Sequence, residues 1–120
     1  MSQKIFVLDD DENACKLAAT ALIRAGYEVQ TQCAAIGATS AIKSFQPDLV
    51  LLDVMMPALS GDTMVEILDR AVKPRPRILF YSNKSAHELR ELTDQTGVEG
   101  YICKLDGPSA LLATIRRVLG

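Results

Sequence analysis

Four short apolar runs alternate with longer segments of mixed polarity along this chain. The runs are rich in β-branched or aromatic residues and lack polar alternation, which is typical of strands in a parallel sheet that is covered on both faces. A further segment that begins with Tyr27 has strand character as well. The pattern therefore predicts five strands, at residues 4–8, 27–31, 49–52, 77–81 and 100–103, the fourth ending near Ser82.

Between the strands, apolar residues recur every three or four positions, as one buried helical face requires. The first helix shows this most clearly, with Ala14, Leu17, Ala18, Ala21, Leu22 and Ala25 on its predicted buried face. The fourth is largely polar, and we expect Leu89 and Leu92 to hold it only weakly. Five helices are expected, at residues 12–25, 35–45, 62–71, 84–96 and 108–119.

Several residues mark where these helices start and stop. Gly26 and Gly97 are expected to end the first and fourth helices, and Pro108 suits the first turn of the last one. Pro47 disfavours helical geometry in the residue before it, so Gln46 is predicted to be extended.

Alternating strands and helices with short connections predict an α/β fold with a doubly wound parallel sheet. We expect five strands in the flavodoxin-like order 2-1-3-4-5, five helices, and a single domain over residues 1–120. In such sheets, ligands bind beyond the carboxyl ends of the strands.

Composition narrows the possible functions. A net charge of −2 gives no basic field for direct nucleic-acid binding, and a short basic run at 73–77 is interpreted as a solvated loop. No apolar stretch approaches the length of a membrane span and no signal peptide is recognised, so we expect a cytoplasmic protein without membrane contact. Cys15, Cys33 and Cys103 have no metal-ligand spacing, and we interpret them as small buried hydrophobic residues rather than a disulfide framework.

Chemically active residues follow four of the strands. Asp9 and Asp10 come after the first strand, Asp53 after the third, Ser82 after the fourth and Lys104 after the fifth. Because crowded carboxylates repel one another, they call for raised pKa values or a bound cation, and oxygen-only ligands suit Mg²⁺.

The following Asp11 and Glu12 are interpreted as a helix cap and a favourable first-turn charge. Lys104 and Ser82 would supply a positive charge and a hydrogen bond to an anion that the carboxylates would repel. This combination indicates a phosphoryl site with a carboxylate nucleophile, since the chain has no Gly-rich phosphate loop. His87, the single histidine, is interpreted as a surface residue.

The sequence resembles the receiver domains of two-component response regulators over essentially its whole length. The resemblance is carried by residues 5–10, 47–57, 60–61, the strand that ends in Ser82, and 100–104. It implies that Asp53 accepts a phosphoryl group from the histidine of a sensor kinase or a histidine phosphotransfer protein. It also implies that Mg²⁺ is held by Asp10 and Asp53, by Asp9 through a water, and by the backbone carbonyl of Met55.

By the same resemblance, Lys104 would pair with the phosphoryl group. The Ser82 hydroxyl would move toward phosphorylated Asp53, and Tyr101 would swing into the vacated space. This would alter a surface made by the fourth helix, fifth strand and fifth helix, through which an output protein not named by the sequence would be contacted. The chain would be a phosphoacceptor with slow self-dephosphorylation rather than an enzyme.

Two features depart from the family pattern. The family usually has a cis proline after its lysine, whereas this chain has Leu105, so the path of the loop and the position of Lys104 are open. Asn83 replaces a small residue, and with Met55 and Lys84 it is expected to hinder the hydrolytic water.

Two other functions are compatible with parts of this pattern. One is a receiver-like docking module that acts without phosphorylation, which the Leu105 departure would favour. The other is a metal-dependent phosphatase that works through an aspartyl phosphate. Such enzymes usually have a second acid two residues after the nucleophile, and Met55 stands there.

Overall fold

Five parallel strands form one sheet in the order β2-β1-β3-β4-β5, which confirms the predicted topology. The computed structural model describes residues 2–56 and 60–120. The strands are β1 (Lys4–Leu8), β2 (Glu28–Gln32), β3 (Leu49–Leu52), β4 (Arg77–Ser82) and β5 (Gly100–Cys103). The helices are α1 (Glu12–Arg24), α2 (Ala38–Phe45), α3 (Gly61–Ala71), α4 (Ala86–Thr96) and α5 (Gly107–Leu119), with a 3₁₀ turn, η1 (Lys104–Asp106), before α5.

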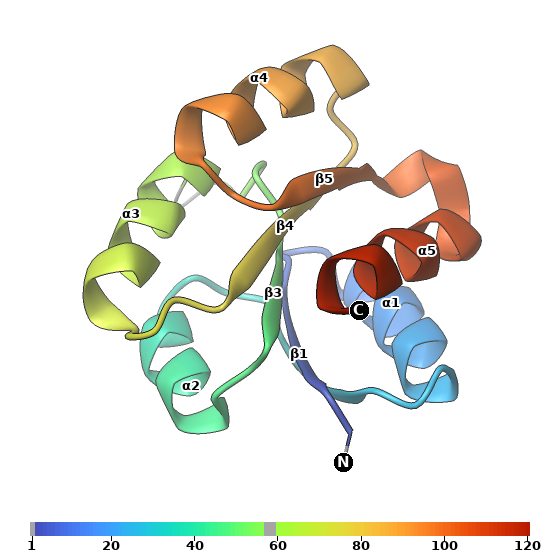
Figure 1. Ribbon diagram of the computed structural model, residues 1–120, viewed down its shortest axis with the longest axis horizontal. Coiled ribbons are helices and arrows are strands. Elements are labelled where there is room, and N and C mark those ends of the chain that lie inside the picture. The colour runs from blue at the N-terminus through green and yellow to red at the C-terminus, as the bar shows by residue number, and fades with distance from the viewer. Residues whose placement is uncertain (1, 57–59) are drawn as a thin grey trace.

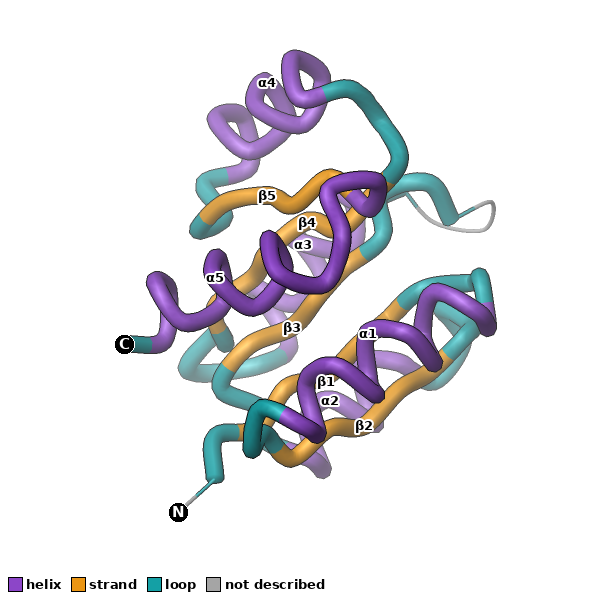
Figure 2. The backbone as a smooth tube through the Cα atoms, turned by 90° about the vertical axis from the view of Figure 1, so that its right-hand side faces the viewer, coloured by secondary structure: helices purple, strands orange, loops and turns teal. Residues whose placement is uncertain are grey.

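The helices cover both faces of the sheet. In Figure 1, α2, α3 and α4 lie on one side and α1 and α5 on the other, and Figure 2 shows α1 and α5 together in front of the strands. Successive residues of a strand point to opposite faces. Ile5 and Val7 therefore pack in the core beneath α1 and α5, whereas Phe6 and Leu8 pack in the core beneath α2, α3 and α4. This explains why the central strands are continuous apolar runs.

The buried face of α1 differs in part from the predicted one. Ala14, Ala18 and Leu22 are buried as predicted, but Leu17 is 72% exposed, and Ala21 and Ala25 are only partly buried. Cys15 packs in the core beneath α1 and α5 instead. The three-to-four-residue spacing admits both positions, and only the seating of the helix on the sheet separates them.

Three local features of the helix ends also become clear. Asp11 caps α1 as predicted, because its carboxylate accepts hydrogen bonds from the backbone N–H groups of Asn13 and Ala14. Helix α2 begins at Ala38 rather than at residue 35, and α4 begins at Ala86 rather than at residue 84. For α4 the reason is Ser85, whose hydroxyl accepts the N–H of Glu88 and sets the start of the helix.

The expectation of an extended Gln46 is wrong. Its φ and ψ of 55° and 58° are left-handed, and its N–H donates to the carbonyl of Ile42 at 2.9 Å. The residue therefore closes α2 in the conformation that glycine usually supplies, because satisfying a helix carbonyl outweighs the local preference before Pro47.

None of the helices in the described part of the chain has the length and apolar character that crossing a bilayer requires.

Candidate functional site

Backbone pairing that continues past the strand ends holds two aspartates at the carboxyl edge of the sheet. Leu8 of β1 pairs with Leu52 of β3, so Asp9 and Asp53 follow neighbouring strands at the same level. The N–H of Asp53 donates to the carbonyl of Leu8 at 3.0 Å, and the N–H of Asp9 donates to the carbonyl of Gln32 at 3.1 Å. The predicted meeting of these residues follows from parallel pairing alone.

Asp9, Asp10 and Asp53 form a cluster of three carboxylates. One oxygen from each lies within 4.8 Å of the others. Asp9 is fully buried, Asp53 is 4% exposed, and Asp10 is exposed. The cluster therefore has a buried floor and one side open to solvent.

The two oxygens of Asp9 have different partners. Its Oδ1 accepts the N–H of Asp11 at 3.0 Å. Its Oδ2 is buried and has no directed hydrogen bond, although the Lys104 ammonium lies 2.7 Å away as an ion pair. A buried carboxylate oxygen that has one ammonium as its partner and lies near two other carboxylates can also accept an oxygen-preferring cation or its bound water, so these residues fit a divalent metal.

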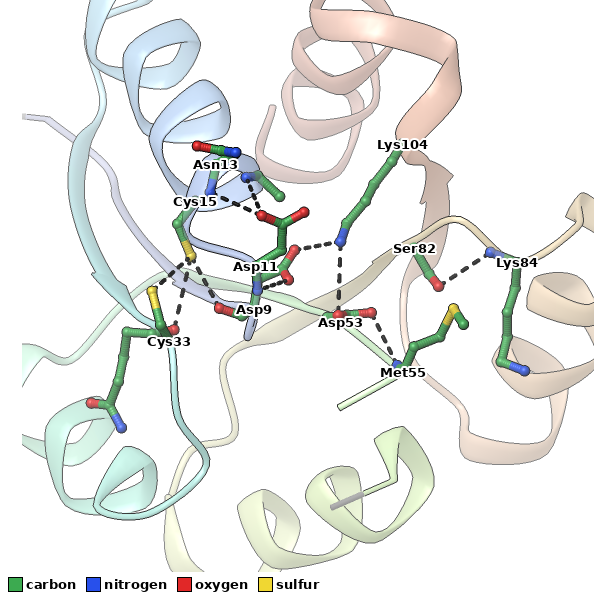
Figure 3. A network of polar contacts seen from close by, with 12 residues as sticks. Asp9, Asp11, Asn13, Cys15, Cys33, Asp53, Met55, Ser82, Lys84 and Lys104 are labelled. Carbon is green, nitrogen blue, oxygen red and sulfur yellow. Dashed lines mark hydrogen bonds and ion pairs between the residues drawn. The ribbon is translucent and has the colours of Figure 1, made fainter. Parts of the chain in front are cut away.

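Lys104 follows the outer strand β5, and its side chain extends to the two buried carboxylates, as Figure 3 shows. Its Nζ lies 2.7 Å from Asp9 Oδ2 and 3.7 Å from Asp53 Oδ2. Burial acts to lower the pKa of Lys104, but the contact with Asp9 and the charge of Asp53 outweigh it, and the pKa is raised. Lys104 is therefore a charged ammonium at neutral pH.

The absence of the family's proline does not displace this lysine. Among the residues that the structure describes, the one cis peptide bond is Lys73–Pro74, so the bond between Lys104 and Leu105 is trans. The chain turns directly into η1, and Leu105 is 87% exposed. The loop thus follows a path without a cis peptide, and it still positions the Lys104 ammonium beside Asp9 and Asp53.

Asp53 lies in surroundings that oppose and support its charge at once. Burial raises the pKa of Asp53 from 3.8 to about 6, against the hydrogen bond from the Met55 N–H and the charge of Lys104, which lower it. The Met55 N–H donates to Asp53 Oδ1 at 3.0 Å. Asp53 is therefore mostly ionised at neutral pH, with one oxygen held by the backbone.

Close packing shapes the loop that follows Asp53. A Cβ added at Gly61 would lie 2.8 Å from Cγ1 of Val54, so the start of α3 approaches this loop too closely for a side chain. Of the predicted residues here, Met55 has a side chain that is 53% exposed, whereas Pro57, at the end of one matching segment, lies outside the described residues.

Ser82 and Tyr101 lie on the neighbouring strands β4 and β5. Ser82 is fully buried at the end of β4, and its hydroxyl accepts the N–H of Lys84 at 3.3 Å. Tyr101 is half-buried, and its phenol raises the pKa of the exposed Arg90 on α4 through a close contact. The two residues thus point to different surroundings, Ser82 toward the loop after β4 and Tyr101 toward α4.

Sequence reasoning missed one pair. The sulfur atoms of Cys15 and Cys33 lie 3.7 Å apart, and the Cys15 thiol donates to the carbonyl of Asp9 at 3.2 Å. Cys15 is buried, as expected, but Cys33 and Cys103 are only half-buried. The spacing of 18 residues carries no signal for this contact, which the β1–β2 pairing creates.

Comparison with known proteins gives a consistent result. The family model described as the response regulator receiver domain matches residues 5–116. The alkaline phosphatase synthesis transcriptional regulatory protein PhoP of Bacillus subtilis is 32% identical over 119 residues, which is 99% of this chain and 49% of PhoP. The DNA-binding response regulator MtrA of Mycobacterium tuberculosis is 29% identical over 116 residues, covering 97% of this chain and 50% of MtrA. The chain thus spans about half the length of these relatives.

Solved structures agree in fold. The chemotaxis response regulator CheY4 of Vibrio cholerae superposes with a TM-score of 0.87 at 26% identity, over 98% of this chain and 99% of CheY4. A signal receiver domain from Bermanella marisrubri superposes with a TM-score of 0.88 at 26% identity, over the full length of both chains. With its five-stranded parallel sheet and an aspartate cluster at the carboxyl edge, this chain belongs to the response regulator receiver domain family.

Proposed function

We propose that this chain accepts a phosphoryl group on Asp53 and signals by changing the surface formed by α4, β5 and α5. The observation that carries the proposal is the position of Lys104, whose ammonium lies 2.7 Å from Asp9 and 3.7 Å from Asp53. A positive charge beside a buried carboxylate nucleophile is suited to an incoming anion that the aspartates alone would repel.

The transfer uses Asp53 as the nucleophile. A carboxylate oxygen of Asp53 attacks phosphorus, the bond to the donor nitrogen breaks, and the donor imidazole leaves with the electron pair. The donor is a phosphohistidine on a sensor kinase or a histidine phosphotransfer protein. The Met55 N–H holds Asp53 Oδ1 during this step, and Lys104 turns from the carboxylates to the phosphoryl oxygens.

Asp10 and Asp53 would hold Mg²⁺ directly, Asp9 would hold it through a water, and the Met55 carbonyl would complete the protein ligands. When bound, the cation supplies positive charge that offsets the carboxylates and the phosphoryl oxygens. The buried Oδ2 of Asp9, which has an ion pair but no directed hydrogen bond, and the clustering of the three carboxylates support this assignment.

The response begins at Ser82. Its hydroxyl would leave the N–H of Lys84 to hydrogen-bond a phosphoryl oxygen, and the half-buried Tyr101 would move inward from its place beside Arg90. Helix α4 is suited to such a change because Leu89 is its one fully buried residue. No turnover is proposed beyond slow loss of the phosphoryl group, and the cytoplasm is the expected compartment.

The test is to incubate the chain with Mg²⁺ and a small acyl phosphate, quench the reaction rapidly, and measure the intact mass of the protein. We expect one added phosphoryl group in the parent chain and none in Asp53→Asn, whose amide is not a nucleophile. An unmodified parent that binds Mg²⁺ and is folded would overturn the proposal in favour of a docking module that acts without phosphorylation. Lys104 contacts both aspartates although Leu105 follows it, and this argues against that alternative.

The switch needs a separate measurement. Phosphorylation of the parent is expected to shift backbone NMR signals across α4, β5 and α5. In Ser82→Ala, the aspartate should still be phosphorylated but those shifts should be much smaller. Equal shifts in both chains would show that the surface change does not depend on Ser82.

A further inference from the structure

Two thiols face each other beside the aspartate cluster. Cys15 lies in the first half of α1 and Cys33 directly follows β2, and their sulfur atoms are 3.7 Å apart. Figure 3 shows the two side chains pointing toward one another, at the opposite side of Asp9 from Lys104. Sulfur atoms at this separation need only a small movement to reach bonding distance, which is about 2.05 Å.

The pair is connected to Asp9 through the backbone. The Cys15 thiol donates to the carbonyl of Asp9 at 3.2 Å and lies 4.0 Å from the carbonyl of Gln32. That same carbonyl of Gln32 accepts the N–H of Asp9 at 3.1 Å, and Gln32 immediately precedes Cys33. A change at either sulfur therefore reaches the backbone of Asp9, whose side chain belongs to the aspartate cluster.

We propose that Cys15 and Cys33 form a reversible disulfide in the presence of a peroxide, and that this bond weakens divalent-cation binding at the aspartate cluster. The half-buried Cys33 is the thiol that the oxidant reaches, whereas Cys15 is 2% exposed. Cys33 attacks the peroxide oxygen and becomes a sulfenic acid with release of water. Cys15 then attacks the Cys33 sulfur, and the hydroxyl leaves as water with the Cys15 proton.

The two steps balance. Two thiols lose two protons and two electrons, and hydrogen peroxide is reduced to two molecules of water. A dithiol reverses the change by thiol–disulfide exchange. The disulfide has no S–H, so the Asp9 carbonyl loses its hydrogen-bond donor. Formation of the bond also pulls Cys33 toward Cys15, and with it the end of β2, where the Gln32 carbonyl accepts the N–H of Asp9.

The first test maps disulfides in the folded Cys103→Ser chain after treatment with hydrogen peroxide. We expect a peptide pair linked through Cys15 and Cys33, lost on treatment with a dithiol. The matched control Cys33→Ser keeps Cys15 and Cys103 and should show no internal disulfide. Oxidation of Cys33 to the sulfinic acid while Cys15 stays a free thiol would overturn the proposal.

The second test compares Mg²⁺ affinity of reduced and oxidised Cys103→Ser chains by calorimetry. This part depends on the proposed function, because it assumes that the cluster binds Mg²⁺. The dissociation constant should rise about tenfold on oxidation. Equal affinities would overturn the coupling. A reduced chain that binds no Mg²⁺ would overturn the coupling and the proposed metal site together, while the disulfide is judged by the peptide map.

Discussion

In the proposed function Asp53 has to be ionised to act as a nucleophile, yet its burial works against ionisation. Its pKa is raised to about 6, whereas Lys104 and the Met55 N–H limit the rise. Without a cation, the folded chain therefore carries a carboxylate that is costlier to ionise than in the unfolded chain. This is a common property of functional carboxylates, whose surroundings serve chemistry rather than stability.

The pKa of Asp53 predicts how stability depends on pH. Because the folded pKa lies above the unfolded value of 3.8, the protonated group favours the fold below about pH 4, and this contribution is lost as pH rises through about 6. We expect Asp53→Asn to raise the free energy of unfolding by about 3 kcal/mol at pH 7, since the pKa rises by about two units and each unit is worth about 1.4 kcal/mol.

Urea unfolding with a chelator, from pH 4 to pH 7, measures this gain. The gain should fall to well under about 1 kcal/mol near pH 4, because there Asp53 is protonated in the folded parent and partly protonated in the unfolded chain. Asp94→Asn, at an exposed position on α4, is the matched control and should change stability little at either pH. A gain that is constant with pH would contradict the burial argument.

Bulk at the entrance to Asp53 is expected to slow loss of the phosphoryl group. The Met55 side chain is 53% exposed, and Asn83 is also exposed in the loop after β4. Replacing either by alanine should admit water more easily and speed the loss by up to about tenfold, equal to about 1.4 kcal/mol of barrier. Time-resolved intact mass measures the rate, with the exposed Ser44→Ala on α2 as the control. Unchanged rates would exclude this role.

At the scale of elements, capping interactions explain where the helices begin and end better than helix propensity does. Asp11 and Ser85 set the starts of α1 and α4 through side-chain hydrogen bonds. Gln46 ends α2 in a left-handed conformation that costs a non-glycine residue about 1 kcal/mol. The apolar period alone does not locate such boundaries, so the starts of α2 and α4 lie three and two residues after the predicted ones, and those of α3 and α5 lie one residue before.

The strain at Gln46 can be relieved by substitution. Gln46→Gly should raise the free energy of unfolding by about 0.5–1 kcal/mol, because glycine adopts positive φ without the Cβ penalty. Ser44→Gly, two residues earlier inside α2, should lower it by a similar amount. Chemical denaturation of the two variants and the parent measures these changes in the free energy of unfolding. If both variants were less stable than the parent, Gln46 would not be strained in this way.

For the whole molecule, the aspartate cluster links parts that are distant in sequence. Asp9 and Asp10 follow β1, Asp53 follows β3, and only the folded sheet brings their oxygens within 4.8 Å. A cation bound there recognises the folded state and not the unfolded chain. Binding and stability should therefore be linked.

Mg²⁺ at about one hundred times its dissociation constant should add about 2.7 kcal/mol to the free energy of unfolding. Thermal or urea unfolding with and without Mg²⁺ measures the gain, which a chelator should reverse. Asp10→Asn removes one proposed ligand and should lose most of the gain, whereas Asp94→Asn should keep it. An equal gain in all three chains would place the cation elsewhere.

The sequence by itself determined the strands, their order and the edge at which Asp9, Asp53 and Lys104 meet. These follow from local rules, because apolar period marks the elements and parallel strands with short crossovers all end on the same edge. The chemistry of carboxylates beside a lysine followed as well, since residue type decides which ions attract or repel.

Only the tertiary structure decided how those residues face one another. The exposure of Leu17, the trans path that still brings Lys104 to 2.7 Å from Asp9, and the contact between Cys15 and Cys33 depend on how helices seat on the sheet and how strands pair. The raised pKa of Asp53 likewise needs the burial that packing creates. Distances of a few ångströms between residues far apart in sequence are set by packing of the whole chain, and no local pattern records them.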